Sequence, residues 1–104
     1  MYIYNVTTNI QEDVHEKWVE WMKNEHIPDM LNTGKFTKVL MSRVMVKEEM
    51  GGITYSVQYT AESKEMLQKY YDENAADLRS RSKAFDGKFV AFRTEMEVVK
   101  ELDS

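Results

Sequence analysis

The chain has 104 residues, of which 42% are hydrophobic and 31% charged, with 18 acidic against 14 basic side chains. This length suits one modest core, so we expect residues 1–104 to form a single domain. The acidic balance offers no attraction to nucleic acid or anionic lipid, and the absence of cysteine excludes disulfides, thiolate metal sites and a cysteine nucleophile.

The first ten residues, MYIYNVTTNI, lack the basic start and the apolar run of a signal peptide. No apolar stretch elsewhere in the sequence is long enough to span a bilayer. We therefore expect a cytoplasmic protein with no membrane span and no nucleic-acid partner.

The chain opens with strand-like alternation over residues 1–10, and from residue 12 the apolar period becomes helical. The residues at helical spacing are Val14, Trp18, Trp21 and Met22. Pro28 predicts the end of this helix, because the residue before a proline avoids the α region. A short further turn then ends at Gly34.

Residues 35–47 are rich in valine and other aliphatic residues, which predicts a second strand. The glycines in residues 48–52 predict a hairpin into a third strand over residues 53–60. These three segments are typical of an antiparallel β-hairpin.

A second helix is predicted to begin after Ser63, a plausible N-cap, and to run irregularly to Gly87. Its basic cluster LRSRSK, residues 78–83, is most simply a solvated helix face. Residues 88–100 predict the last strand. The order βαββαβ predicts an α+β, ferredoxin-like fold: a four-stranded antiparallel sheet with two helices on one face.

The segments EHIPDMLNTGKF (25–36) and ENAADLRSRSKAFDGKF (73–89) both end in Gly-Lys-Phe, which indicates duplication of a βαβ unit. His26 and Pro28 have no counterpart in the second copy, where Asn74 and Ala76 stand in their places. Any chemistry is therefore expected in the part of the motif that the copies do not share.

Alternation in the first and third strands predicts one apolar side, under the helices, and one polar, open side. The predicted helix side holds Tyr2, Tyr4, Val6, Ile53, Tyr55, Val57 and Tyr59. The repeat register predicts that the open side holds Asn5, Thr7, Phe36, Leu40, Val44, Ser56, Gln58, Phe89, Ala91, Arg93 and Glu95. Because the flanks of this open face are apolar, we predict a homodimer packed face to face around a cavity.

The segment WMKNEHIPDML (21–31) is similar to the Trp-x-x-x-x-His-x-Pro layout of the EthD-like and muconolactone-isomerase-like branches of the dimeric α/β-barrel superfamily. Over its whole length the chain resembles an uncharacterised bacterial family of domains of unknown function in that superfamily. The resemblance implies a homodimer in which His26 faces the barrel cavity.

Relatives in that superfamily include cofactor-free monooxygenases, isomerases, mutarotases, dehydratases and haem-degrading enzymes, as well as members without demonstrated catalysis, so the resemblance leaves catalysis open. Haem degraders combine a first-strand asparagine with a tryptophan and a histidine from the second half. Asn5 could supply the first, but residues 53–104 contain neither tryptophan nor histidine. We therefore predict no cofactor.

His26 is the candidate general acid or base, because histidine titrates near neutrality. The alternative is a helix-end histidine that only contacts the last carbonyl groups. The candidate ligand-binding residues are Asn5, Thr7, Ser56, Gln58, Arg93 and Glu95. Alternatively, these groups bond one another, water or a partner chain, with Arg93 and Glu95 as an intersubunit ion pair.

No metal is predicted, because His15 and His26 lie 11 residues apart, about 16 Å along a helix. Three functions remain open from the sequence. The chain is a dimer that binds a small organic ligand between its sheets, a cofactor-free isomerase, lyase or monooxygenase that uses His26, or a purely structural or protein-binding dimer.

Overall fold

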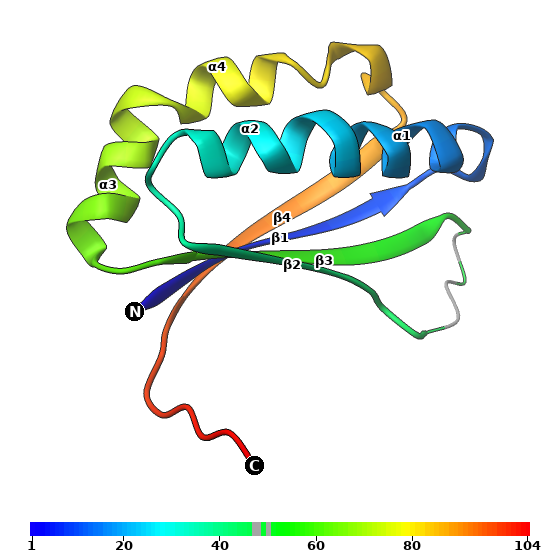
Figure 1. Cartoon of the computed structure of the whole chain (residues 1–104). Coiled ribbons are helices and arrows are strands. Elements are labelled where there is room, and N and C mark those ends of the chain that lie inside the picture. Colours follow the sequence, from blue (N-terminus) through cyan, green and yellow to red (C-terminus); the bar gives the residue numbers. More distant parts are fainter. Residues whose placement is uncertain (47–48, 50) are drawn as a thin grey trace.

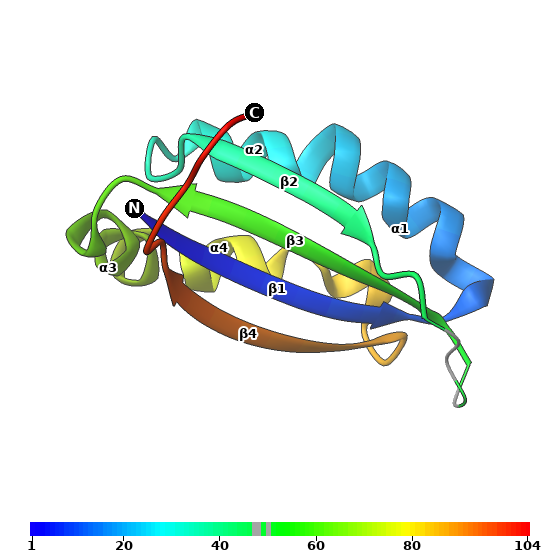
Figure 2. The ribbon, with the colours of Figure 1, turned by 90° about the horizontal axis from the view of Figure 1, so that it is seen from below.

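The computed structural model describes residues 1–46, 49 and 51–104. Its four strands form one antiparallel sheet in the order β2-β3-β1-β4. The strands are β1 (Tyr2–Ile10), β2 (Lys38–Arg43), β3 (Ile53–Ala61) and β4 (Phe89–Glu97). All described helices lie on one face of this sheet (Figure 1). None covers the other, open face, which the C-terminal segment after β4 crosses (Figure 2). The predicted α+β, ferredoxin-like architecture is confirmed.

The first half contributes one helical rod, in which α1 (His15–Trp21), a π-helical turn (Met22–His26) and α2 (Ile27–Asn32) follow one another without a break. A 3-10 turn (Glu12–Val14) precedes it. The prediction that Pro28 ends the helix was wrong. Pro28 lies in the first turn of α2, where a missing N–H costs little, and the wider π turn before it closes with the Ile27 N–H donating to the Met22 carbonyl.

The second half contributes α3 (Lys64–Glu73), α4 (Ala75–Ser80) and a 3-10 turn (Lys83–Phe85). The Ser63 hydroxyl oxygen accepts the backbone N–H of Met66 at 3.1 Å, which confirms the predicted N-cap. The break between α3 and α4 at Asn74 confirms the irregular course predicted for this segment. Within the described part of the chain, no helix combines the length and apolar character needed to cross a membrane.

Gly34 and Gly87 occupy equivalent positions, each where the chain passes from the helical layer toward a strand, and each has φ of +76°. A Cβ atom would meet nothing within 4 Å at either position, so the left-handed backbone, rather than lack of space, favours glycine. This equivalence agrees with the repeated Gly-Lys-Phe motif. Of the predicted second strand and hairpin, residues Lys47, Glu48 and Met50 lie outside the described residues.

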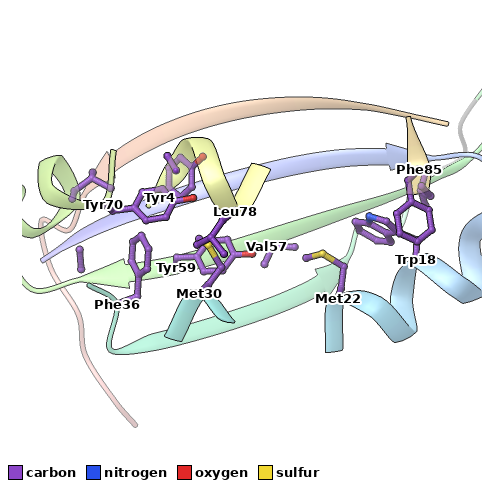
Figure 3. Close-up of a cluster of buried hydrophobic side chains, with 14 residues drawn as sticks. Tyr4, Trp18, Met22, Met30, Phe36, Val57, Tyr59, Tyr70, Leu78 and Phe85 are labelled. Carbon is purple, nitrogen blue, oxygen red and sulfur yellow. The ribbon is translucent and has the colours of Figure 1, made fainter. Parts of the chain in front are cut away.

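The core fills the space between the sheet and the helices (Figure 3). Its largest fully buried side chains are Tyr4, Ile10, Met30, Val57, Tyr59, Leu67 and Tyr70. Tyr4, Phe36 and Tyr70 pack ring against ring, with centroids 4.9 to 6.3 Å apart. Rows of tyrosine and valine therefore face the helices on β1 and β3, as predicted.

The face predicted for β4 was wrong. Antiparallel pairing sets Val6 opposite Arg93 and Tyr4 opposite Glu95, so both charged residues lie on the helix side. The same register puts Phe89 and Ala91 on the helix side as well. The β4 residues on the open face are instead Val90, Phe92, Thr94 and Met96.

The predicted face of β4 was wrong because the repeat aligns Phe89 with Phe36. Through this alignment, the face predicted for β2 was assigned to β4 as well. Phe36 precedes the regular strand, which begins at Lys38, and its side chain is buried under the helices. Counted from the phenylalanine of the shared Gly-Lys-Phe motif, the open-face positions of β2 and those of β4 are therefore out of step by one residue. Because strand side chains alternate with a period of two, that single step reverses the face of every β4 residue.

Candidate functional site

A cavity of about 80 Å³ lies between the helices and the sheet, on the side of β1 and β4. One water molecule needs only about 10–15 Å³, so the cavity has room for a larger group. Most of its wall is apolar. The apolar residues include Val6, Trp18, Trp21, Met22, Val57 and Ala91. The sequence predicts a cavity between the sheets of two subunits, whereas this one lies within a single chain.

His26 lines this cavity and stacks on Trp21, with ring centroids 4.8 Å apart and planes 22° apart. Burial lowers the pKa of His26 to about 4, against an opposing effect of Asp29, and the positive charges of Arg81 and Arg93 lower this pKa further. His26 is therefore neutral at pH 7. Its Nδ1 atom is buried and has no hydrogen-bond partner among the described residues.

The backbone around His26 explains its position. His26 is the last residue of the π-helical turn, a widened turn that is frequent at functional sites. Trp21 immediately precedes this turn and supplies the ring on which the imidazole stacks. The predicted alternative, a helix-end histidine, does not describe this geometry, because α2 continues beyond His26 to Asn32.

Another part of the cavity wall is basic. The Arg79 Nη2 atom donates to the Tyr4 hydroxyl oxygen at 3.0 Å, and the Arg93 Nε atom donates to the same oxygen at 3.1 Å. Tyr59 and Tyr70 complete this region, and burial raises the pKa of both phenols above the ordinary value. Both phenols therefore stay protonated at pH 7.

The six predicted ligand-binding residues do not form one site. On the open face, the Ser56 hydroxyl donates to Asn5 Oδ1 at 2.7 Å, and Asn5 Nδ2 donates to the Thr7 hydroxyl oxygen at 3.0 Å. These three residues therefore bond one another. Arg93 lines the cavity on the helix side, where Glu95 accepts a hydrogen bond from the Tyr71 hydroxyl at 3.0 Å.

Gln58 lies opposite Asn5 in the pairing of β3 with β1, and it lines a second hollow of about 370 Å³ on the open face. The residues of β1 to β3 that line this hollow include Ile3, Lys38, Leu40 and Thr60. Its wall contains no histidine and no arginine. We therefore regard the cavity on the helix side, which both His26 and Arg93 line, as the candidate functional site.

The sequence did not identify Tyr4 or Arg79 as site residues. Tyr4 was assigned to the core, where its ring does lie, but its hydroxyl reaches the cavity. Arg79 was assigned to a solvated helix face, and it is indeed exposed, but its Nη2 atom reaches the Tyr4 hydroxyl at the cavity wall. The available signal was that Arg79 directly follows Leu78, a buried core residue, so its long side chain could extend beside the apolar stripe.

The second histidine, His15, is not part of this cavity. Its Nε2 atom lies 2.7 Å from the Tyr55 hydroxyl oxygen, and the two rings stack. Among residues 1–46, 49 and 51–104, no three histidine or carboxylate side chains come together in a way that could hold a metal ion.

The fold and this cavity define a ferredoxin-like α+β protein with several solved structural neighbours. A dimeric ferredoxin-like protein from an uncultured marine organism has a TM-score of 0.71 and 18% identity over all of both chains. An ethyl tert-butyl ether D (EthD) family protein from Bacillus halodurans has a TM-score of 0.69 and 17% identity, covering 95% of this chain and 100% of that one.

A third neighbour, SnoaB, is a cofactor-independent oxygenase from Streptomyces nogalater; it has a TM-score of 0.70 and 6% identity, with 99% of this chain and 98% of that chain covered. Identities this low show a shared fold alone. The chain itself belongs to the family described as a domain of unknown function, DUF4286, whose model matches residues 1–99. A search of curated proteins finds no match.

Proposed function

We propose that the chain is a homodimer in which each subunit binds a small organic molecule in the cavity between the helices and the sheet. The observation that carries this proposal is the buried, unpartnered Nδ1 atom of His26 at the wall of that cavity. Buried polar atoms in native proteins nearly always have a partner. A bound molecule with a hydroxyl or carbonyl group would supply one.

The remaining wall favours an organic ligand over an inorganic ion. Trp18, Trp21 and Met22 offer an aromatic and polarisable surface, and Val57 and Ala91 add aliphatic carbon. Typical small-molecule sites combine a mostly apolar lining with a few polar groups that orient the ligand. His26 is a polar group of that kind.

The proposed dimer interface is the open face of the sheet. Four of its side chains are large, apolar and exposed: Leu40, Val90, Phe92 and Met96. Apolar side chains gathered on one sheet face mark an interaction surface. A marine ferredoxin-like neighbour is described as dimeric, which supports a homodimer. Light scattering is expected to give twice the mass of one chain; the mass of one chain would contradict the dimer.

Ligand binding is tested with a panel of small aromatic alcohols, amides and acids, read out by thermal shift and calorimetry. A ligand at a hundred times its Kd stabilises the folded state by about 2.7 kcal/mol. Ala91→Leu should fill the cavity and abolish binding, because Ala91 lines it from β4. Ala76→Leu, on an exposed position of α4, is the matched control. No binding to wild type, or equal binding to Ala91→Leu, would contradict the proposal.

Catalysis is the second candidate, favoured by the neutral imidazole at the cavity wall. A neutral histidine accepts a proton, and a cofactor-free isomerase, lyase or monooxygenase requires such a base. With a pKa of about 4, His26 is a weak base, so this candidate ranks behind binding.

His26→Ala separates the two candidates once a ligand is known. If His26 is a catalytic residue, the variant should bind the ligand within a few-fold of wild type, yet lose at least about 100-fold in turnover. Retained turnover would exclude this role for His26. If wild type binds the compound without converting it, the binding function alone is supported.

A further inference from the structure

Two arginines from distant parts of the chain converge on a single phenol oxygen. Arg79 comes from α4 and Arg93 from β4, and their donor nitrogen atoms lie 3.0 and 3.1 Å from the hydroxyl oxygen of Tyr4. The two nitrogen atoms therefore lie within about twice that distance of each other. All three residues line the cavity, so two positive charges meet at one part of its wall.

No carboxylate of the described residues neutralises this pair of charges. The ion pairs among the described residues join Lys35 to Glu73, Arg81 to Asp29 and Asp77, and Lys88 to Asp13. Glu95, which shares the helix side of β4 with Arg93, accepts its hydrogen bond from Tyr71 instead. Arg79 and Arg93 therefore share the Tyr4 hydroxyl oxygen, and neither forms an ion pair with a carboxylate of the described residues.

Two neighbouring guanidinium groups repel each other, and an anion between them relieves this repulsion. Both arginines are exposed, so an anion can reach them from solvent. Each guanidinium carries five N–H donors, and the described hydrogen bonds use one nitrogen atom of each. The remaining donors can bind two oxygen atoms of one anionic group in a planar, forked arrangement.

We propose that Tyr4, Arg79 and Arg93 form an anion subsite that binds the carboxylate of a small apolar carboxylic acid. This inference rests on the proposed binding function and names the class of ligand. The carboxylate contacts the two guanidinium groups, and the apolar body of the ligand extends along the wall formed by Trp21 and Met22. A carboxylate fits better than a phosphate, because the rest of the wall is largely apolar.

The position of His26 agrees with this arrangement. The positive charge of Arg93 contributes to the lowered pKa of His26, which places the imidazole within electrostatic reach of the proposed subsite. A ligand that enters between them would meet the arginines with its acidic group. His26 and its stacked partner Trp21 then lie beside the body of the ligand.

The test compares benzoate, benzamide and inorganic phosphate by calorimetry on the wild-type protein. These probes separate charge from shape, since benzamide has nearly the shape of benzoate without its charge. Benzoate is expected to bind at least about 10-fold more tightly than either. Benzamide binding as tightly as benzoate would overturn the anion subsite. Phosphate binding as tightly would overturn its assignment to a carboxylate. Both wild-type comparisons stand even if a variant fails to fold.

Arg79→Gln and Arg93→Gln should each weaken benzoate binding at least about 10-fold and leave benzamide binding unchanged. The matched control is Arg81→Gln, which removes the same charge from an exposed ion pair outside the cavity wall. Unchanged benzoate affinity in both cavity variants overturns the inference. If neutral aromatics bind wild type but not Ala91→Leu, and benzoate has no advantage, the proposed function stands and this inference alone fails.

Discussion

The helix-covered face of the sheet and its open face treat their polar groups differently. On the open face, Asn5, Thr7 and Ser56 bond one another in the middle of the sheet. On the helix-covered face, His26 Nδ1 has no partner among the described residues, and Arg93 shares one phenol oxygen with a second arginine. Polar groups that already have hydrogen-bond partners suit a protein–protein interface, whereas polar groups without such partners suit a ligand site.

Apolar side chains are buried on the helix-covered face and exposed on the open face. Val57 and Tyr59, on the helix side of β3, are no more than 1% exposed, whereas Phe92 on the open face is 68% exposed. Burial of apolar surface on the helix side therefore already contributes to the stability of the single chain. On the open face the same driving force remains available for association with a second copy.

The largest expected effect comes from a charge on the helix-covered face. Val57→Asp places a carboxylate at a fully buried position with no partner provided for it, at an expected cost of several kcal/mol, comparable to the whole stability of a small domain. We expect loss of the folded far-UV circular dichroism spectrum. Leu40→Asp is the matched control on the open face, and it should keep that spectrum. A Val57→Asp protein with the urea midpoint of wild type would contradict this difference between the faces.

The next effect tests the open face directly. Phe92→Asp should keep the fold and weaken the proposed dimer at least about 100-fold in Kd, roughly 2.7 kcal/mol, because two apolar surfaces then enclose a charge. Sedimentation equilibrium measures this change. Ala76→Asp adds the same charge on exposed α4 and should leave the dimer intact. A Phe92→Asp protein that dimerises like wild type would place the interface elsewhere.

The unusual pKa of His26 predicts an acid-dependent loss of stability. The folded pKa of about 4 lies below the ordinary value of 6.5, so the unfolded chain binds the proton first as the pH falls. Stability should therefore be complete above pH 6.5 and decrease toward pH 4, by on the order of 2–3 kcal/mol for this one group. Urea denaturation between these two pH values measures the decrease.

His26→Gln provides the comparison for that measurement, since glutamine stays neutral throughout. Its stability should fall less steeply than that of wild type between pH 6.5 and pH 4. The difference between the two curves isolates His26 from the carboxylates and from His15. Parallel curves would mean that His26 is solvated and that its pKa is ordinary.

How far the sequence predicted these two faces depended on how clearly each strand alternates. In β1 and β3, tyrosine and valine alternate with polar residues, so the side under the helices was predicted correctly. In β4, the sequence FVAFRTEME has aromatic and aliphatic residues on both sides, and its pattern favours neither. The repeat then decided its face, and the single-residue difference near Phe36 reversed the outcome.

The candidate site was likewise predicted only in part. His26 was identified because its neighbourhood differs from the second copy of the repeat, and that difference can be read along the chain. Tyr4, Arg79 and Arg93 meet only after β1, α4 and β4 pack together. Their convergence depends on the β4 register and on the reach of one long side chain from α4. Neither property has a signature in local spacing.

The smallest effect examines the polar network of the open face. Ser56→Ala removes the hydroxyl that donates to Asn5 Oδ1, a hydrogen bond of 2.7 Å to a residue only 9% exposed. We expect a loss of about 1 kcal/mol in the free energy of unfolding, measured by urea denaturation. Ser42→Ala, at the exposed position opposite Ser56 in β2, is the control, and it should change stability by less than about 0.5 kcal/mol.

A double-mutant comparison then links this network to the proposed dimer. In the Phe92→Asp background the open face is exposed to solvent, so water can replace the Ser56 hydroxyl. The loss of unfolding free energy caused by Ser56→Ala should then fall toward zero. In the dimer, water is excluded and the orphaned Asn5 oxygen retains its full cost. Equal costs in both backgrounds would show that dimerisation does not cover this network. The homodimer would then have to use a different surface from the one that Phe92, Val90 and Leu40 define.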